Sequence, residues 1–146
     1  MKNISKLTVE SRVIELLNTQ LKDFPVCRII PSESPDYVLQ VSRHYRIGVE
    51  ITRISSHKTA GIPSENSSYR FTVADIQKAI DRKADKSTLY QKNRLNEIWL
   101  ILVTGSDQVC KGILPVNLNE MHVNPHGFRR VLLADMEKNK LMVITN

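Results

Sequence analysis

The sequence predicts a mixed α/β or α+β domain in which a central β-sheet is flanked by helices. Apolar residues recur at helical spacing near residues 8–21 and 72–90, whereas several short segments rich in Val and Ile are typical of strands. The order along the chain is helix, three strands, helix, strand and then a β-rich tail. The chain has 146 residues, a length that fits one domain over residues 1–146.

The first helix is expected from Thr8 to Leu21. Thr8 is a candidate N-cap, and Pro25 lies beyond the end of the helix as a stop signal. A short strand follows from Val26 to Ile30, and Ser32–Pro35 is a turn because it combines serine and proline.

Two further strands, Tyr37–Val41 and Arg46–Ile54, are joined around Ser42–His44 and form a hairpin. If the turn centres on Arg43, the numbers of directly opposite residues sum to 86. One face of the hairpin is then wholly apolar and the other collects the polar residues. A slip of one residue would mix the two faces, so the pattern itself favours this register.

The rest of the chain begins with a long polar loop, residues 55–70, and loops of this length are usually functional or mobile. A helix is expected from about Thr72 to Leu89 or Tyr90. The continuous apolar run Ile98–Thr104 indicates a strand that is buried on both faces. The tail predicts a strand near Gly112–Leu114, a short helix near Asn117–Met121, strands at Arg130–Ala134 and Leu141–Ile144, and a turn at Glu137–Lys140.

The net charge of +6 is concentrated in one part of the chain. Residues 42–94 hold eleven basic and five acidic side chains, whereas the segments before and after them are each balanced. A localised basic segment is the electrostatic pattern expected of a polyanion-binding protein. A solvated lysine-rich helix face would give the same count, and both explanations stay open on charge alone.

The two cysteines, Cys27 and Cys110, lie far apart and lack the spacing of a zinc site or a disulfide framework. They are expected to be buried thiols of a cytoplasmic protein. No apolar run approaches the ~20 residues that cross a membrane, so no membrane association is expected.

The acidic residues of the hairpin are the strongest functional signal. In the predicted register Asp36 faces Glu50 on the polar face, next to strand residues that are mostly Val and Ile. Two carboxylates that face each other on neighbouring strands repel each other unless one is protonated or a cation lies between them. Oxygen ligands of this kind suit Mg²⁺ or Mn²⁺. The alternative is that Asp36 caps a turn while Glu50 pairs with Arg46 or Arg53.

The motif Pro35-Asp36, followed by Gly48-Val49-Glu50-Ile51-Thr52, resembles the PD-(D/E)XK phosphodiesterase superfamily. The resemblance covers roughly residues 8–104 and implies a restriction-endonuclease-like αβββαβ core with a β-rich C-terminal extension. It implies that Asp36, Glu50 and the main-chain carbonyl of Ile51 bind the metal. An acid of the first helix often assists in that family, and Glu10 or Glu15 could take this place.

The chain departs from the family pattern at Thr52, which stands where the family has a lysine. A threonine cannot stabilise an anion as an ammonium does. Some family members carry the lysine on the following helix, and here Lys83 lies on the same stripe as Ile76 and Ile80. We therefore expect Lys83 to point toward the acids, with Lys86 as the second candidate. The alternative is that Lys83 extends past its aliphatic neighbours into water.

The predicted function is Mg²⁺-dependent hydrolysis of a nucleic-acid phosphodiester, with DNA favoured over RNA. Many small nucleases are dimers, so a homodimer is a further expectation. Two alternatives stay open: an inactive nucleic-acid-binding module on the same fold, and a protein-interaction module whose acids are structural. The residues expected to contact the nucleic acid are Arg53, Lys58, Arg70, Gln77 and Lys78.

Overall fold

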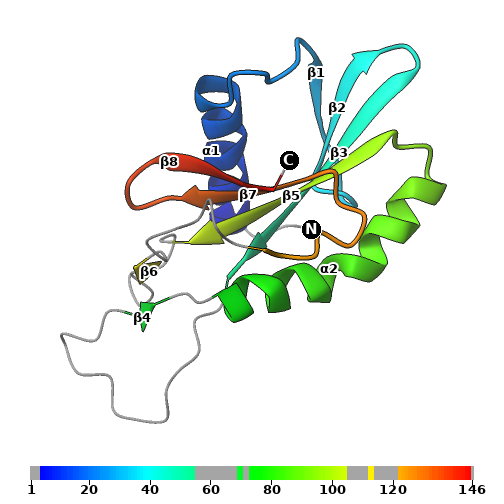
Figure 1. The fold of residues 1–146 in the computed structure, drawn as a ribbon. Helices are drawn as coiled ribbons and strands as arrows, with labels where there is room; N and C mark the ends of the chain where they lie inside the picture. The colour runs from blue at the N-terminus through cyan, green and yellow to red at the C-terminus, as the bar shows by residue number, and fades with distance from the viewer. Residues whose placement is uncertain (1–3, 55–68, 71–72, 105–111, 114–121, 146) are drawn as a thin grey trace.

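A computed structural model describes residues 4–54, 69–70, 73–104, 112–113 and 122–145 (Figure 1). Its elements are α1 (Ile4–Gln20), β1 (Arg28–Pro31), β2 (Tyr37–Ser42), β3 (Tyr45–Arg53), β4 (Tyr69–Arg70), α2 (Val73–Lys92), β5 (Glu97–Thr104), β6 (Gly112–Ile113), β7 (Arg130–Asp135) and β8 (Lys140–Thr145).

Six strands form one mixed sheet in the order β1-β2-β3-β5-β7-β8. The first three are antiparallel, β3, β5 and β7 are parallel, and β8 returns antiparallel to β7. Helix α2 makes the crossover between the parallel strands β3 and β5 (Figure 1). The expected mixed α/β architecture with a central sheet is thus confirmed. Strands β4 and β6 pair with each other in a separate parallel ladder.

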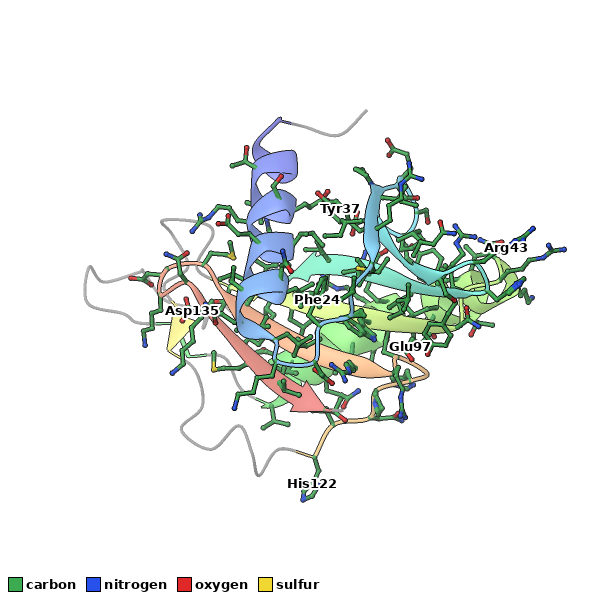
Figure 2. All side chains as sticks on the ribbon, turned by 90° about the horizontal axis from the view of Figure 1, so that it is seen from above. Phe24, Tyr37, Arg43, Glu97, His122 and Asp135 are labelled. Atoms are coloured by element: carbon green, nitrogen blue, oxygen red, sulfur yellow. The ribbon has the colours of Figure 1, made fainter. Side chains whose placement is uncertain are left out.

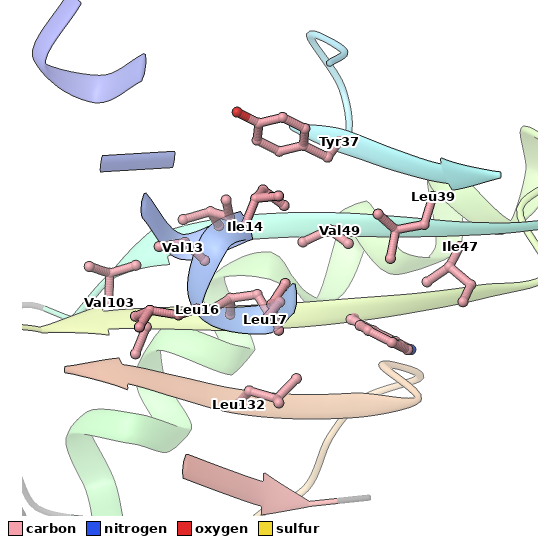
Figure 3. Packing of buried hydrophobic residues seen from close by; sticks show 14 of the residues in the cluster. Val13, Ile14, Leu16, Leu17, Tyr37, Leu39, Ile47, Val49, Val103 and Leu132 are labelled. Carbon is pink, nitrogen blue, oxygen red and sulfur yellow. The ribbon is translucent and has the colours of Figure 1, made fainter. Parts of the chain in front are cut away.

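The two helices cover opposite faces of the sheet. On the α1 face, Val13 and Leu17 are completely buried against apolar strand residues that include Leu39 and Val49 (Figure 3). On the other face, Ile76 and Ile80 of α2 pack in a second cluster with alternate residues of β5 and β7. Strand β5 is therefore buried on both faces, as its continuous apolar sequence predicts.

The predicted register of the β2–β3 hairpin is confirmed. Tyr37 lies opposite Val49 and Leu39 lies opposite Ile47, so that opposite numbers sum to 86. The register shifts between Gln40 and Ser42, just before the turn. Arg43 projects from that turn, at the tip of the hairpin (Figure 2). The split into an apolar face toward α1 and a second face toward α2 follows directly from this register.

Two predicted boundaries near the N-terminus were wrong. Helix α1 begins at Ile4 rather than at Thr8, because residues 4–7 contain no helix breaker and continue the helix by a turn. Strand β1 begins at Arg28, and Val26, expected in the strand, is 96% exposed. Pro31 is tolerated at the end of β1 because this strand lies at the edge of the sheet.

The remaining predicted elements have mixed outcomes. The tail hairpin is confirmed by the antiparallel pair β7–β8. The strand expected at 112–114 is present as β6, whereas residues 69–70, expected in the long loop, form β4. Residues 55–68 of that loop and the short helix expected at 117–121 lie outside the described residues. Neither α1 nor α2 has the length and apolar character that a membrane-spanning helix needs, and they are the only helices among the described residues.

Candidate active site

The two acids of the sequence motif lie on neighbouring strands and are both buried. Asp36 directly precedes β2, Glu50 lies within β3, and each is only 4% exposed. Extending the observed register by one pair places the two residues opposite each other, where Cβ atoms are typically about 4.5–5.5 Å apart. The hairpin therefore brings together the two carboxylates that the sequence predicts as a pair.

The carboxylate of Asp36 is held by the backbone of β3. Its Oδ2 accepts a hydrogen bond from the N–H of Ile51 at 2.8 Å, so the side chain replaces the next rung of the β2–β3 ladder. The N–H and C=O of one strand residue point to the same side of the strand. The carbonyl of Ile51 therefore points to the same side of β3 as its N–H, toward Asp36. This is the direction that a metal ligand shared with Asp36 needs.

Glu50 is surrounded by donors from α2. Its Oε1 lies 3.3 Å from Nζ of Lys83 and 3.5 Å from Nζ of Lys86, and its Oε2 accepts a hydrogen bond of 2.8 Å from the hydroxyl of Tyr90. The alternative in which Glu50 pairs with Arg46 or Arg53 is therefore wrong. Two ammonium groups and a phenol offset the free-energy penalty of burying this carboxylate.

Helix α2 directs both lysines to the same acid. Ile76 and Ile80 are fully buried and anchor the helix on the sheet, and Lys83 follows on the same stripe. The Lys83 side chain is 21% exposed and that of Lys86 is 45% exposed. Lys83 therefore does not extend past its neighbours into water. The two lysines, expected as alternatives, both contact Glu50.

The segment at residues 124–126, which precedes β7, helps to hold α2 in place. Ser87 is buried and donates a hydrogen bond of 2.9 Å to the carbonyl of His126. Gln77 donates to the carbonyl of Asn124 at 3.0 Å and accepts from its N–H at 2.8 Å, and His126 pairs with Asp81 at 2.7 Å. These contacts fix the helix that carries both lysines.

Tyr90 is a site residue whose role the sequence did not reveal. It is 1% exposed, and its hydroxyl accepts a hydrogen bond of 2.9 Å from Ser34 while it donates to Glu50. Burial raises the pKa of Tyr90 strongly, and the negative charges of Glu50 and Asp36 raise it further. The phenol therefore stays protonated and remains a donor. Sequence reasoning expected core or rim packing here, although Tyr90 shares the helical stripe of Lys83.

The two candidate acids of the first helix differ in burial. Glu10 is 1% exposed and Glu15 is exposed, so only Glu10 is buried as a ligand of a buried site would be. Across the described ranges, however, no group of three or more acidic, His or Cys side chains is placed to hold a metal ion. Glu10 therefore does not complete a three-acid cluster with Asp36 and Glu50. The position of Glu10 on α1 accounts for its burial but does not set its distance from the hairpin.

The residues expected to contact nucleic acid are only partly described. Arg53 is exposed at the end of β3, where Arg82 donates a hydrogen bond of 3.2 Å to its carbonyl, and Lys78 is exposed on α2. Gln77 bonds within the protein, so the amide expected to reach a phosphate is already engaged. The side chains of Lys58 and Arg70 lie outside the described part of the chain.

Comparisons of the chain with protein-family models, with characterised proteins and with solved structures gave no match. The functional argument therefore depends on the geometry of the site.

Proposed function

We propose that this protein is a metal-dependent phosphodiesterase that hydrolyses nucleic acid, with DNA as the favoured substrate. The observation that carries the proposal is the buried Glu50 carboxylate, which faces Asp36 across a hairpin and contacts two lysine ammonium groups. The order α1, β1–β3, α2, β5, with β3 parallel to β5, also supports a restriction-endonuclease-like core.

The donor atoms at this site fit Mg²⁺ or Mn²⁺. Asp36 and Glu50 supply carboxylate oxygens, and Ile51 directs a carbonyl to the same side, so all candidate ligands are hard oxygen atoms. Zinc sites are most often built from cysteine and histidine, whereas the candidate ligands here are oxygen atoms. A divalent cation held here would supply a water of lowered pKa and neutralise charge on the phosphate.

The lysines of α2 would take the role of the strand lysine that the PD-(D/E)XK superfamily has at the position of Thr52. Glu50 and Thr52 lie two residues apart and so point to the same face of β3, and α2 packs on that face. An ammonium from α2 therefore approaches the acids from the side that the strand lysine would occupy. Lys83, the more buried, is held at Glu50, and Lys86 is exposed enough to contact a phosphate oxygen. Their charge would stabilise the pentacovalent phosphate.

Basic side chains on α2 and at the end of β3 would bind the phosphate backbone of the substrate. Lys78 and Arg82 are exposed on α2, and Arg53 is exposed at the end of β3, where it lies next to Arg82. Binding through such residues weakens as the salt concentration rises, because the release of counterions from the nucleic acid then contributes less free energy. We expect affinity for DNA that falls steeply with salt concentration and depends little on base sequence.

The test is whether the full chain cleaves plasmid and linear DNA in the presence of Mg²⁺ or Mn²⁺. Asp36→Asn and Glu50→Gln should each abolish cutting, and Asp85→Asn, at an exposed acid of α2, should leave it intact. Cleavage that persists in both site variants, or that survives chelation of the metal, would refute the proposal.

The lysine contacts also support a second candidate, a nucleic-acid-binding module without catalysis. Lys83 and Lys86 neutralise Glu50 without a metal, so the fold can be stable when no cation binds. Salt-sensitive retention of DNA without cutting at any metal concentration would favour this candidate. Neither retention nor cutting would favour the protein-interaction module.

A further inference from the structure

The hydroxyl of Tyr90 joins three elements of the candidate site. It belongs to α2, donates to Glu50 of β3 and accepts from Ser34, which is two residues before Asp36. The same hydroxyl thus connects the strand that carries one acid to the turn that presents the other. Its ring is 1% exposed, so the hydroxyl is held in position by the surrounding core.

The contacts of Glu50 divide its two oxygens. An ionised carboxylate offers about four acceptor positions, two on each oxygen. The ammonium groups of Lys83 and Lys86 both lie on Oε1, and the Tyr90 hydroxyl takes one position on Oε2. These contacts leave the second position of Oε2 for a further partner. The Tyr90 hydroxyl on Oε2 and the two ammonium groups on Oε1 together favour one orientation of the carboxylate.

We propose that Tyr90 is a positioning residue of the proposed metal site: it orients the Glu50 carboxylate and couples it to the turn that presents Asp36. This inference rests on the proposed function, because it assigns Tyr90 a role in the binding of the cation by these two acids. Tyr90 contacts a metal ligand rather than the substrate, and loss of such a contact typically weakens metal affinity by about 10- to 100-fold.

Tyr45 offers a matched control for removal of this hydroxyl. Its phenol also donates a hydrogen bond to a glutamate, Glu97, but Tyr45 shares the strand face of Ile47 and Val49, which α1 covers. Tyr90→Phe and Tyr45→Phe therefore remove the same hydroxyl donor from a glutamate, in the core for Tyr90 and at the surface for Tyr45. Ser34→Ala removes the second partner of the Tyr90 hydroxyl at an exposed position and leaves the Tyr90 ring in place.

The experiment measures Mn²⁺ binding by calorimetry and DNA cleavage as a function of Mn²⁺ concentration. Tyr90→Phe should weaken Mn²⁺ binding about tenfold and raise the Mn²⁺ concentration for half-maximal cleavage equally, with the KM for DNA unchanged. Ser34→Ala should weaken Mn²⁺ binding about threefold, the size of one neutral hydrogen bond. Tyr45→Phe should change neither measurement. Thermal unfolding of each variant identifies a folding defect.

The outcomes separate the two proposals. If the wild type neither binds Mn²⁺ nor cleaves DNA, the proposed function fails and this inference fails with it. If the wild type binds and cleaves, but folded Tyr90→Phe matches it in Mn²⁺ affinity, only the role of Tyr90 is refuted. If Tyr90→Phe does not fold, wild-type Mn²⁺ affinity in Ser34→Ala would refute that role.

Discussion

The two lysines at Glu50 make a prediction about stability that does not depend on catalysis. We expect removal of both Lys83 and Lys86 to destabilise the protein by more than the sum of the two single losses. The reason is that either lysine can compensate the buried carboxylate when the other is missing. Methionine is the chosen replacement because it keeps the apolar stem of lysine and removes its charge.

The magnitude follows from the distances and the burial. At 3.3 and 3.5 Å, with an effective dielectric constant of about 20, each lysine attracts Glu50 by about 5 kcal/mol before desolvation. The desolvation of a carboxylate that is 5% exposed offsets much of this attraction. Lys83→Met should lower the free energy of unfolding by about 1.5 kcal/mol. Lys86→Met, at a half-exposed side chain, should lower it by about 0.5 kcal/mol.

The double variant leaves Glu50 without either cation. Breaking a buried pair in this way typically costs about 3–5 kcal/mol, which exceeds the roughly 2 kcal/mol expected for two independent losses. Adding Glu50→Gln to the double variant should recover about half of that loss, because a neutral amide needs no counter-charge. Glu50→Gln alone should change stability little, because the amide oxygen still accepts hydrogen bonds and both ammonium groups are on partly exposed side chains.

The assay is equilibrium urea denaturation followed by the fluorescence of Trp99, the single tryptophan. Lys92→Met, at an exposed lysine in the last turn of α2, is the control for loss of a helix lysine. The reasoning is refuted if the double variant loses no more than the sum of the single variants. It is also refuted if Glu50→Gln fails to recover stability in the double variant.

Three further predictions concern other parts of the structure. In Gly48→Ala the new Cβ would lie 2.8 Å from Cδ1 of the buried Leu95, so thermal unfolding should show a loss of about 1 kcal/mol. A hydrogen bond from Arg130 lowers the pKa of Asp23 below 3.8, so this pair stabilises the fold above that pH and the effect fades as the pH falls through the lowered value. Asp23→Asn should therefore cost less than about 1 kcal/mol near neutral pH and nothing in strong acid, measured by pH-dependent melting. Lys78→Ala should weaken DNA binding similarly for all sequences and reduce the salt slope by about one, measured by fluorescence anisotropy.

Local periodicity determined much of the fold. The alternation of side chains along β2 and β3 fixed both the register and the face toward which Glu50 points, because a slip of one residue would expose the apolar set. The helical stripe through Ile76 and Ile80 predicted that Lys83 faces the sheet. These features repeat every two residues or every 3.6 residues, so the sequence is sufficient to determine them.

Only the tertiary structure decided which groups complete the site. That both lysines reach one oxygen of Glu50 depends on the distance between α2 and β3 and on the length of each side chain. The link from Ser34 through Tyr90 to Glu50 joins residues that are 56 and 40 positions apart in the chain, and no local pattern specifies it. Glu10 is a second case, because the sequence offered both Glu10 and Glu15, and only the structure shows that Glu10 is the buried one. Sequence periodicity sets the direction of a side chain, whereas the packing of whole elements against one another sets what that side chain meets.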